Sequence, residues 1–187
     1  MHLNVLPKMN RSVPLIKLRQ ERWQPVPTDS GVYWWFFPQS LVSDCGLSDY
    51  CDLAELNLRG NELGQFCLYH GLARNLSQRI SWHADQELTQ GALRTGFLST
   101  FRFTLLSLFQ IEYYDGKNSI DSIFDQLSVS WQVTSSKEEA KTIEEQELRG
   151  NSHYPLNIQG NRHPETLDFI RHLKAMRKCY KAANLVG

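Results

Sequence analysis

The stretch Leu68–His83 constrains the fold most, because it carries the signals of a strand, a glycine turn and a helix in one short run. Phe66–Tyr69 is an apolar run typical of a buried strand, and Gly71 is expected to end that strand. Asn75 is expected to cap a helix whose apolar positions recur at helical spacing, at Leu76, Ile80 and Ala84. The stretch therefore predicts a helix docked on the strand that precedes it.

Three polar side chains fall close to this predicted interface. Arg79 and His83 are one helical turn apart, so they share a helix face near the apolar stripe, and Tyr69 ends the strand. A guanidinium and an imidazole held against a sheet are costly unless an anion binds there. The stretch therefore indicates a site that binds phosphate.

Length and composition favour one domain with additional segments, since 187 residues with 41% hydrophobic content can bury a single sizeable core. Neither an apolar run long enough to span a bilayer nor a secretory signal is found, so we expect a cytoplasmic protein without a membrane partner. The cysteines show no CxxC spacing, which predicts reduced thiols and no zinc site: Cys45, Cys51, Cys67 and Cys179.

Charge is distributed unevenly along a chain whose formal net charge is +0. Neutrality argues against a protein coated in nucleic acid, but basic residues gather before the first strand and again near the C-terminus. These two clusters allow a localised phosphate-binding surface, and solvated helix faces are an equally open interpretation. The clusters are Lys8, Arg11, Lys17, Arg19 and Arg22, and then Arg162, Arg171, Lys174, Arg177, Lys178 and Lys181.

The rest of the chain alternates strand and helix signals. Residues 1–30 hold four prolines and read as an arm with one short helix around Leu15–Arg22, whereas Gly31–Phe37 is a strand expected to be covered on both faces. A long acidic connector, 38–64, then separates the two strands, as an insertion with its own task or a surface excursion.

Further elements follow the helix that Asn75 is expected to cap, which is expected to end at Gly91–Gly96. We expect helices at 98–108 and 120–127, a half-exposed strand at 128–134, a helix from the capping box Ser136–Glu139 to about Leu148, extended chain at 154–158, and a last helix from His163.

Five features in this order resemble the GIY-YIG nuclease family. Gly31-Val32-Tyr33 stands where the family has GIY, and Tyr69-His70-Gly71 stands where it has YIG. Arg79 and His83 match the family's arginine and a histidine common in it, and Glu145 precedes Asn157 at the separation found between the family's metal-binding glutamate and terminal asparagine. The departures are His70 in place of an aliphatic residue, Leu72 in place of a polar one, and the length of 38–64.

The resemblance implies an α+β fold with a small, mainly antiparallel, three-stranded sheet flanked by helices. On this reading a single domain comprises a basic arm at 1–30, a nuclease core at 31–158 that includes the insertion 38–64, and a basic C-terminal helix at 159–187.

The same resemblance implies a Mg²⁺-dependent DNA endonuclease, with Mn²⁺ as a substitute, of the small sequence-specific restriction type. Glu145 would hold the metal, because hard carboxylate oxygens suit Mg²⁺. Arg79 would bind the scissile phosphate and neutralise charge in the transition state. Tyr33 or Tyr69 would act as general base, as in the family, with its pKa lowered by nearby cations.

Two further residues would assist. His83 would relay a proton or hold a tyrosine oxygen, and Asn157 would orient the glutamate or a bound water. The partner would be double-stranded DNA, and a single active site per chain would require a homodimer or higher oligomer to cut both strands. Candidate DNA contacts are Arg74, Arg102, Arg162, Lys174 and Lys178, although for Arg102 the sequence favours an arginine that extends from a core helix.

Two other functions stay open on the sequence. One is a nicking or structure-selective nuclease of repair, recombination or mobile elements. The other is a catalytically silent DNA-binding module.

Overall fold

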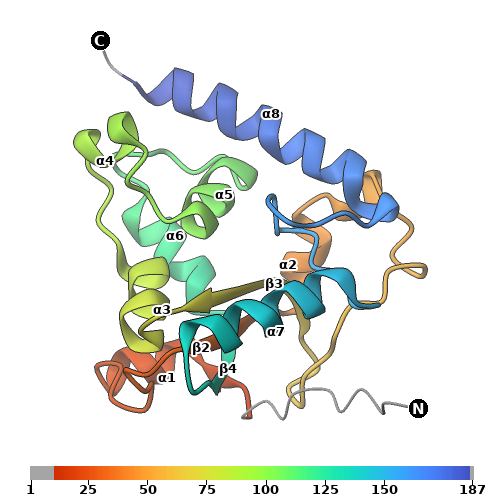
Figure 1. The fold of residues 1–187 in the computed structure, drawn as a ribbon. Helices are drawn as coiled ribbons and strands as arrows, with labels where there is room; N and C mark the ends of the chain where they lie inside the picture. Colours follow the sequence, from red (N-terminus) through yellow and green to blue (C-terminus); the bar gives the residue numbers. More distant parts are fainter. Residues whose placement is uncertain (1–10, 186–187) are drawn as a thin grey trace.

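A four-stranded antiparallel sheet runs through the middle of the protein (Figure 1). The structure is a computed structural model that describes residues 11–185. The strands are β1 (Val13–Pro14), β2 (Gly31–Phe37), β3 (Phe66–Ala73) and β4 (Ser128–Val133), in the order β1-β4-β2-β3. The expected three-stranded sheet is wrong by one strand, because Val13 and Pro14 of the N-terminal arm pair with β4.

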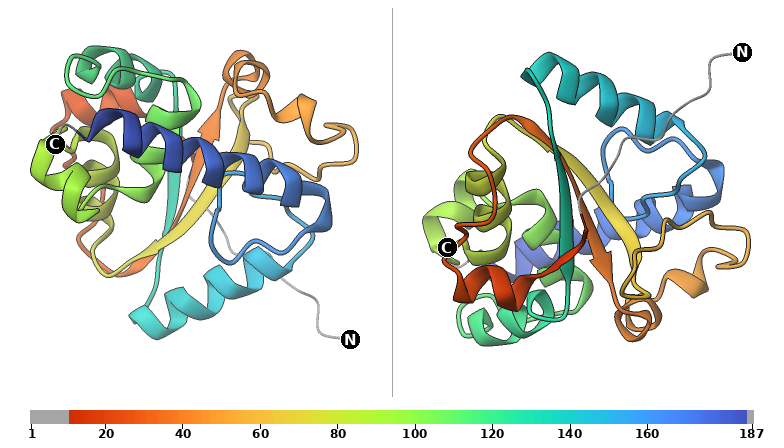
Figure 2. Two further views of the ribbon diagram at one scale, coloured as in Figure 1. Left: turned by 90° about the horizontal axis from the view of Figure 1, so that it is seen from above. Right: turned by 90° about the horizontal axis from the view of Figure 1, so that it is seen from below.

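Helices cover both faces of this sheet (Figures 1 and 2). They are α1 (Leu15–Gln20), α2 (Gln39–Asp44), α3 (Leu76–Asp85), α4 (Gln90–Thr95), α5 (Thr100–Leu108), α6 (Lys117–Phe124), α7 (Lys137–Arg149) and α8 (Leu167–Asn184), with short 3₁₀ turns η1 (Leu47–Asp49) and η2 (Pro164–Thr166). The predicted caps of α3 and α7 are confirmed: Asn75 and Ser136 accept hydrogen bonds from the backbone N–H groups of Gln78 and Glu139.

Strand β2 divides the core into two layers, because all seven of its residues are buried. Tyr33, Trp35 and Phe37 pack in one layer with residues of α1, α3, α5 and α6. Val32, Trp34 and Phe36 pack in the other layer against α7. The prediction that both faces of this strand are covered is confirmed.

Gly71 does not end β3, which continues to Ala73, so the expected break is wrong. Gly71 lies opposite Tyr33 in the ladder, and a Cβ atom there would meet the Tyr33 phenol oxygen at 2.5 Å. The glycine therefore makes room for a tyrosine ring instead of turning the chain.

Two other local predictions are corrected. Strand β4 is buried over 128–131 where half exposure was expected, since it lies inside the sheet between β1 and β2. The segment Gly91–Gly96, expected only to end the helix capped by Asn75, overlaps the short helix α4, and α3 itself ends earlier, at Asp85.

The connector 38–64 and the arm both contribute to the core. Leu41 and Leu47 of the connector are buried, as are Leu15 and Leu18 of α1. Lys8, one of the basic residues of the arm, lies outside the described residues. The free cysteines agree with the prediction of reduced thiols.

Helix α8 lies across the upper end of the molecule, above α5 (Figures 1 and 2). The ring of Tyr180 in α8 contacts that of Phe103 in α5 at 5.7 Å between centroids. Within residues 11–185, no helix combines the length and the apolar character that crossing a membrane requires.

Candidate active site

Two phenols from neighbouring strands meet on one face of the sheet. Tyr33 of β2 and Tyr69 of β3 have ring centroids 6.4 Å apart, and their hydroxyls are hydrogen-bonded to each other. The Tyr33 oxygen also lies 2.7 Å from Nε2 of His83, which α3 presents to the sheet. With Ser99, whose hydroxyl lies 2.5 Å from Nδ1 of His83, these residues form a buried group that we term the tyrosine cluster.

The hydrogen-bond directions in the tyrosine cluster follow from Tyr33. The hydrogen bond between the two phenols raises the pKa of Tyr33 and lowers that of Tyr69, so Tyr33 donates its proton to Tyr69. The Tyr33 oxygen is then left to accept the Nε2–H of His83, and Nδ1 of that neutral imidazole accepts the proton of Ser99. A chain of donors therefore ends on the Tyr69 oxygen.

Burial keeps every member of this chain neutral in the free protein. Burial raises the pKa of Tyr33 well above its ordinary value and that of Tyr69 to about 12, and it lowers the pKa of His83 to about 3. The charge of Arg79 lowers the pKa of both tyrosines, but burial outweighs it. His83 therefore acts as a neutral hydrogen-bond donor near pH 7.

Helix α7 places Glu144 against the backbone of β3, within electrostatic range of the tyrosine cluster. Burial raises the pKa of its carboxyl group, a hydrogen bond from the backbone of Leu72 opposes this, and its charge raises the pKa of both tyrosines. Among the described residues it forms no ion pair. Glu144 is thus a half-buried carboxylate without a cationic partner in the described chain, and its charge is felt by two phenols.

Glu145, the expected metal ligand, points elsewhere. Its side chain is 47% exposed and lies 3.8 Å from the Lys141 ammonium and 4.0 Å from the Arg149 guanidinium. The helical period explains the difference, because Ala140, Ile143 and Glu147 pack toward the sheet and position 144 shares their face. That periodicity was a signal in the sequence that could have identified Glu144.

Arg79 lies at the rim of a cavity of about 440 Å³ next to the cluster. Its guanidinium stacks over the Trp82 ring at 5.0 Å and has no carboxylate partner in the described part of the chain. Arg74 and Lys137 also line the cavity, whose described lining contains no acidic residue. Such a cavity attracts anions.

Asn157 holds the free edge of β3. Its side-chain amide accepts the His70 N–H at 2.9 Å and donates to the His70 carbonyl at 2.7 Å. These bonds occupy the buried amide on backbone between Tyr69 and Gly71, so its contacts run to the strand and not to a glutamate. Asn157 therefore positions the residues of the second tyrosine motif.

The comparison with protein families agrees with this geometry. A family model described as the GIY-YIG catalytic domain matches residues 31–179, which is most of the chain. The protein belongs to the GIY-YIG family. No curated protein and no solved structure matches the chain. The GIY-YIG domain indicates a nuclease, which implies a DNA substrate, and nucleases of this family generally use divalent metal ions.

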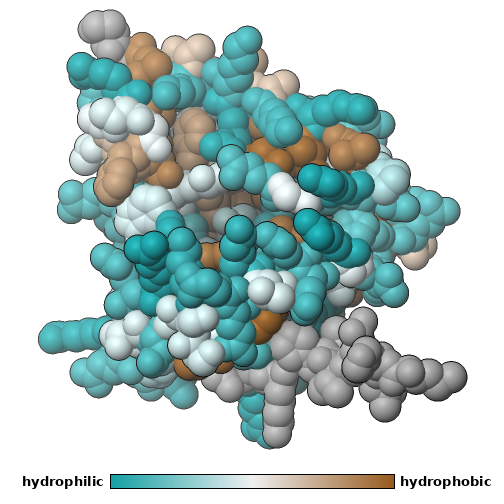
Figure 3. Space-filling view, in the orientation of Figure 1, coloured by the Kyte–Doolittle hydropathy of each residue, from teal (hydrophilic) through white to brown (hydrophobic). Residues whose placement is uncertain are grey.

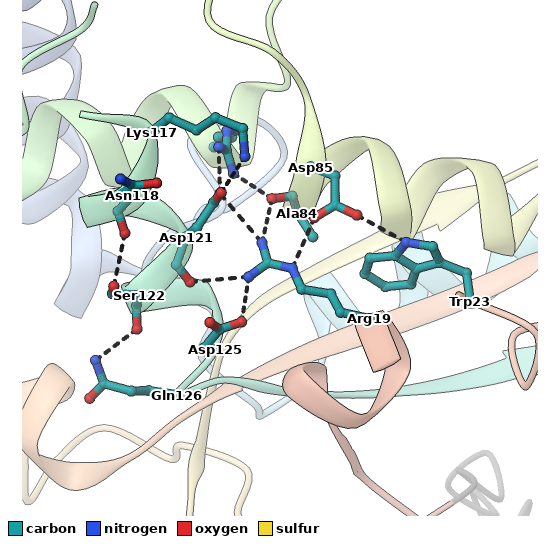
Figure 4. A network of polar contacts seen from close by, with 11 residues as sticks. Arg19, Trp23, Ala84, Asp85, Lys117, Asn118, Asp121, Ser122, Asp125 and Gln126 are labelled. Carbon is teal, nitrogen blue, oxygen red and sulfur yellow. Dashed lines mark hydrogen bonds and ion pairs between the residues drawn. The ribbon is translucent and has the colours of Figure 1, made fainter. Parts of the chain in front are cut away.

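Arg102 does not belong to the surface of this GIY-YIG domain, so its role as a DNA contact is corrected. Its side chain is fully buried in α5, with Nη2 2.8 Å from an Asp121 oxygen and Nη1 bonded to the Ala84 carbonyl. Asp121 also binds Arg19 and Lys117 (Figure 4). The guanidinium is occupied by a structural network and unavailable to DNA.

The other candidate DNA contacts of the GIY-YIG domain are exposed. Arg74 lies at the cavity, and Arg162, Lys174 and Lys178 lie in and before α8. Over α7 the surface is almost continuously hydrophilic, whereas hydrophobic residues show mainly between α4 and α8 (Figure 3). The role of these four residues as DNA contacts is a proposal.

A second group of residues in the GIY-YIG domain offers metal-ligand atoms, but the tautomer of one of its histidines does not suit metal binding. Among the described residues, ligand atoms of His153, His163 and Glu165 lie within 4.8 Å of one another. Nδ1 of His153 accepts the Asn57 N–H at 3.0 Å, so neutral His153 carries its proton on Nε2. That nitrogen has no lone pair for a metal.

Proposed function

We propose that this GIY-YIG protein is a Mg²⁺-dependent DNA endonuclease of the sequence-specific, restriction-like type. The observation that carries the proposal is that Arg79 of α3 and Glu144 of α7 both interact electrostatically with Tyr69 of β3, while neither has a partner of opposite charge in the described chain. A half-buried carboxylate without a partner, such as that of Glu144, is costly unless a ligand compensates it.

The residues present fit a hard divalent cation. Glu144 is a carboxylate without an ion pair, and Mg²⁺ binds proteins through one or two carboxylates while keeping several waters. Mn²⁺ would bind the same oxygen ligands. A bound cation supplies charge neutralisation at the scissile phosphate. We therefore propose Glu144, and not its neighbour Glu145, as the metal ligand.

Arg79 would bind a non-bridging oxygen of the scissile phosphate. Its guanidinium is held over Trp82 at the mouth of an anion-attracting cavity, so it is both accessible and oriented. As water attacks phosphorus and the bond to the leaving oxygen breaks, negative charge grows on the phosphoryl oxygens, and a fixed cation stabilises that charge.

Tyr69 would be the general base, acting in its ionised form. The donor chain Ser99, His83, Tyr33 ends on the Tyr69 oxygen, and the charges of Arg79 and Arg177 both lower its pKa. These interactions stabilise the Tyr69 phenolate, which would take a proton from the attacking water. Tyr33 would then be a positioning residue, since its oxygen is already enclosed between His83 and Tyr69.

A plasmid cleavage assay tests the function. Purified protein is incubated with supercoiled plasmid and Mg²⁺, then with Mn²⁺ or EDTA, and the ends are mapped by sequencing. We expect metal-dependent cuts that share one end sequence. Scattered nicks would favour the nicking or structure-selective nuclease, because one active site cuts one strand, and failure to cut any DNA with either metal would favour a binding module.

Oligomeric state sharpens the same assay. A restriction-like enzyme with one site per chain needs two copies to break both strands, so we propose a homodimer on DNA. Linear product that appears before nicked circles, with a rate that rises as the square of protein concentration, would support it. Nicked circles that accumulate first at every concentration would count against it.

A further inference from the structure

Arg177 of helix α8 is the one partly buried arginine near the tyrosine cluster that the nuclease proposal leaves without a binding role. Its guanidinium lies over the Phe103 ring at 5.0 Å. Its Nε atom is enclosed and has no hydrogen-bond partner within residues 11–185. The side chain is thus fixed by packing, with part of its hydrogen-bonding capacity unused.

The electrostatic surroundings of Arg177 contain a phenol and no acid. Burial lowers its pKa, and Tyr69 is the group whose charge opposes this. In return, the charge of Arg177 lowers the pKa of Tyr69. The guanidinium therefore lies within electrostatic range of Tyr69, and α8 packs on α5, whose Phe101 ring stacks on that of Tyr69 at 4.4 Å between centroids.

Other partly or fully buried arginines of the protein are compensated by carboxylates. Arg59 lies 3.2 Å from Glu147, Arg102 lies 2.8 Å from Asp121, and Arg19 binds three aspartates. No ion pair to Arg177 is found in the described structure. An uncompensated cation in this setting is retained at a cost that an anionic ligand would offset.

Two arginines thus approach Tyr69 from different elements, Arg79 from α3 and Arg177 from α8. Arg79 is assigned to the scissile phosphate above, which leaves Arg177 for another anionic group of the same polymer. We propose that Arg177 binds a phosphate of the DNA backbone next to the scissile one, and so sets the register of the strand against Tyr69. This inference rests on the proposed nuclease function.

The first test compares matched arginine variants on α8. Arg177→Gln removes the buried guanidinium, and Arg171→Gln makes the same change at an exposed residue that pairs with Asp168. Binding of a fluorescent DNA duplex is measured by anisotropy with Ca²⁺, which replaces Mg²⁺ to prevent cleavage. We expect Arg177→Gln to weaken binding about tenfold or more and to reduce the salt slope of the binding constant by about 1, whereas Arg171→Gln stays within about twofold.

The second test changes the DNA as well as the protein and identifies the phosphate. Single phosphates around a mapped cut site are replaced by uncharged methylphosphonates, and cleavage and binding are measured for the wild-type protein and for Arg177→Gln. We expect one position outside the scissile phosphate at which the wild type loses affinity and the variant loses nothing further. Arg177→Lys should restore part of the affinity, since it keeps the charge.

Two results would overturn the inference. One is Arg177→Gln binding DNA like Arg171→Gln, with the two proteins melting within a few degrees of each other. The other is that the loss of affinity caused by Arg177→Gln adds in full to the loss caused by every methylphosphonate, while the cleavage pH profile shifts to higher pH. Arg177 would then act on the pKa of Tyr69 alone and would bind no phosphate. Failure of the wild type to cut DNA would overturn the nuclease proposal instead, and the binding comparison would still stand.

Discussion

Two regions of the protein hold arginines that pack against core elements, and they differ in what surrounds the charge. Around α1 and α6, Arg19 and Arg102 share Asp121, and Arg19 also binds Asp85 and Asp125 (Figure 4). Around the tyrosine cluster, Arg79 and Arg177 lie over aromatic rings without a carboxylate partner in the described chain. The first region satisfies its own charges, and the second leaves cations for something outside the chain.

The glutamates of α7 show the same contrast within one helix. Glu147 is buried and binds Arg59 and the Tyr154 hydroxyl, and Glu145 is exposed beside Lys141 and Arg149. Glu144 has burial without a cation. The comparison teaches that the lack of a partner, more than burial or sequence spacing, distinguishes the candidate catalytic charges from structural ones.

The largest expected effect is on cleavage by Arg79→Ala. Removing a cation that binds the scissile phosphate and stabilises the charge that grows on it should lower kcat/KM about 10³-fold, which is about 4 kcal/mol. Stability should fall by about 1 kcal/mol or less, because only a stacking contact with Trp82 is lost. Single-turnover plasmid cleavage and urea unfolding measure the two effects. A variant that cuts normally would remove Arg79 from the account.

Tyr69→Phe and Tyr33→Phe separate the two phenols. Losing the general base should cost about 10²-fold or more in cleavage rate. Losing one hydrogen bond to that base should cost about tenfold, since Tyr33 acts through Tyr69. Rates at saturating DNA across pH 6 to 9 test this, and a larger loss for Tyr33→Phe would reverse the assignment.

Arg102→Met tests the satisfied side of the comparison. We expect the free energy of unfolding to drop by about 2 kcal/mol, because Asp121 and the Ala84 carbonyl lose a buried donor while Arg19 and Lys117 still bind Asp121. DNA affinity of the folded variant should match that of the wild type. Weaker DNA binding without loss of stability would mean that the buried guanidinium reaches substrate after all.

The smallest expected effect is an acid dependence of stability. His83 has a pKa lowered by burial to about 3, so below about pH 6.5 the unfolded chain binds a proton there that the folded chain does not. Unfolding free energy should fall with decreasing pH by about 1.4 kcal/mol per pH unit from this residue alone. Urea unfolding between pH 6.5 and 5 should therefore show a shallower slope for His83→Asn than for the wild type. Equal slopes would contradict a neutral, buried imidazole.

Local signals in the sequence predicted much of the fold. The caps Asn75 and Ser136 fixed the starts of α3 and α7, and the aromatic run at 31–37 predicted a strand covered on both faces. The pairing of Val13 and Pro14 with β4 had no such signal, because two residues carry no period and their partner lies far along the chain. Gly71 was misread for the same reason, since its role depends on a ring from another strand.

The candidate site was predictable in its types of residue and less so in its members. Motif order pointed to Tyr33, Tyr69, Arg79 and His83, which the structure brings together around the cluster and its cavity. Spacing to Asn157 favoured Glu145, although the apolar positions of α7 place residue 144 on the face toward the sheet. Arg177 required knowledge of how α8 packs on α5, which no local pattern contains.

The most direct measurement is plasmid cleavage by Glu144→Gln and Glu145→Gln, run beside the wild type with Mg²⁺. Both variants remove one carboxylate charge from consecutive positions of the same helix, so they match in chemistry and differ in the direction and burial of the side chain. We predict that Glu145→Gln cuts like the wild type and that Glu144→Gln loses activity about 10³-fold. Cleavage that survives Glu144→Gln, or that is lost only with Glu145→Gln, would contradict the account.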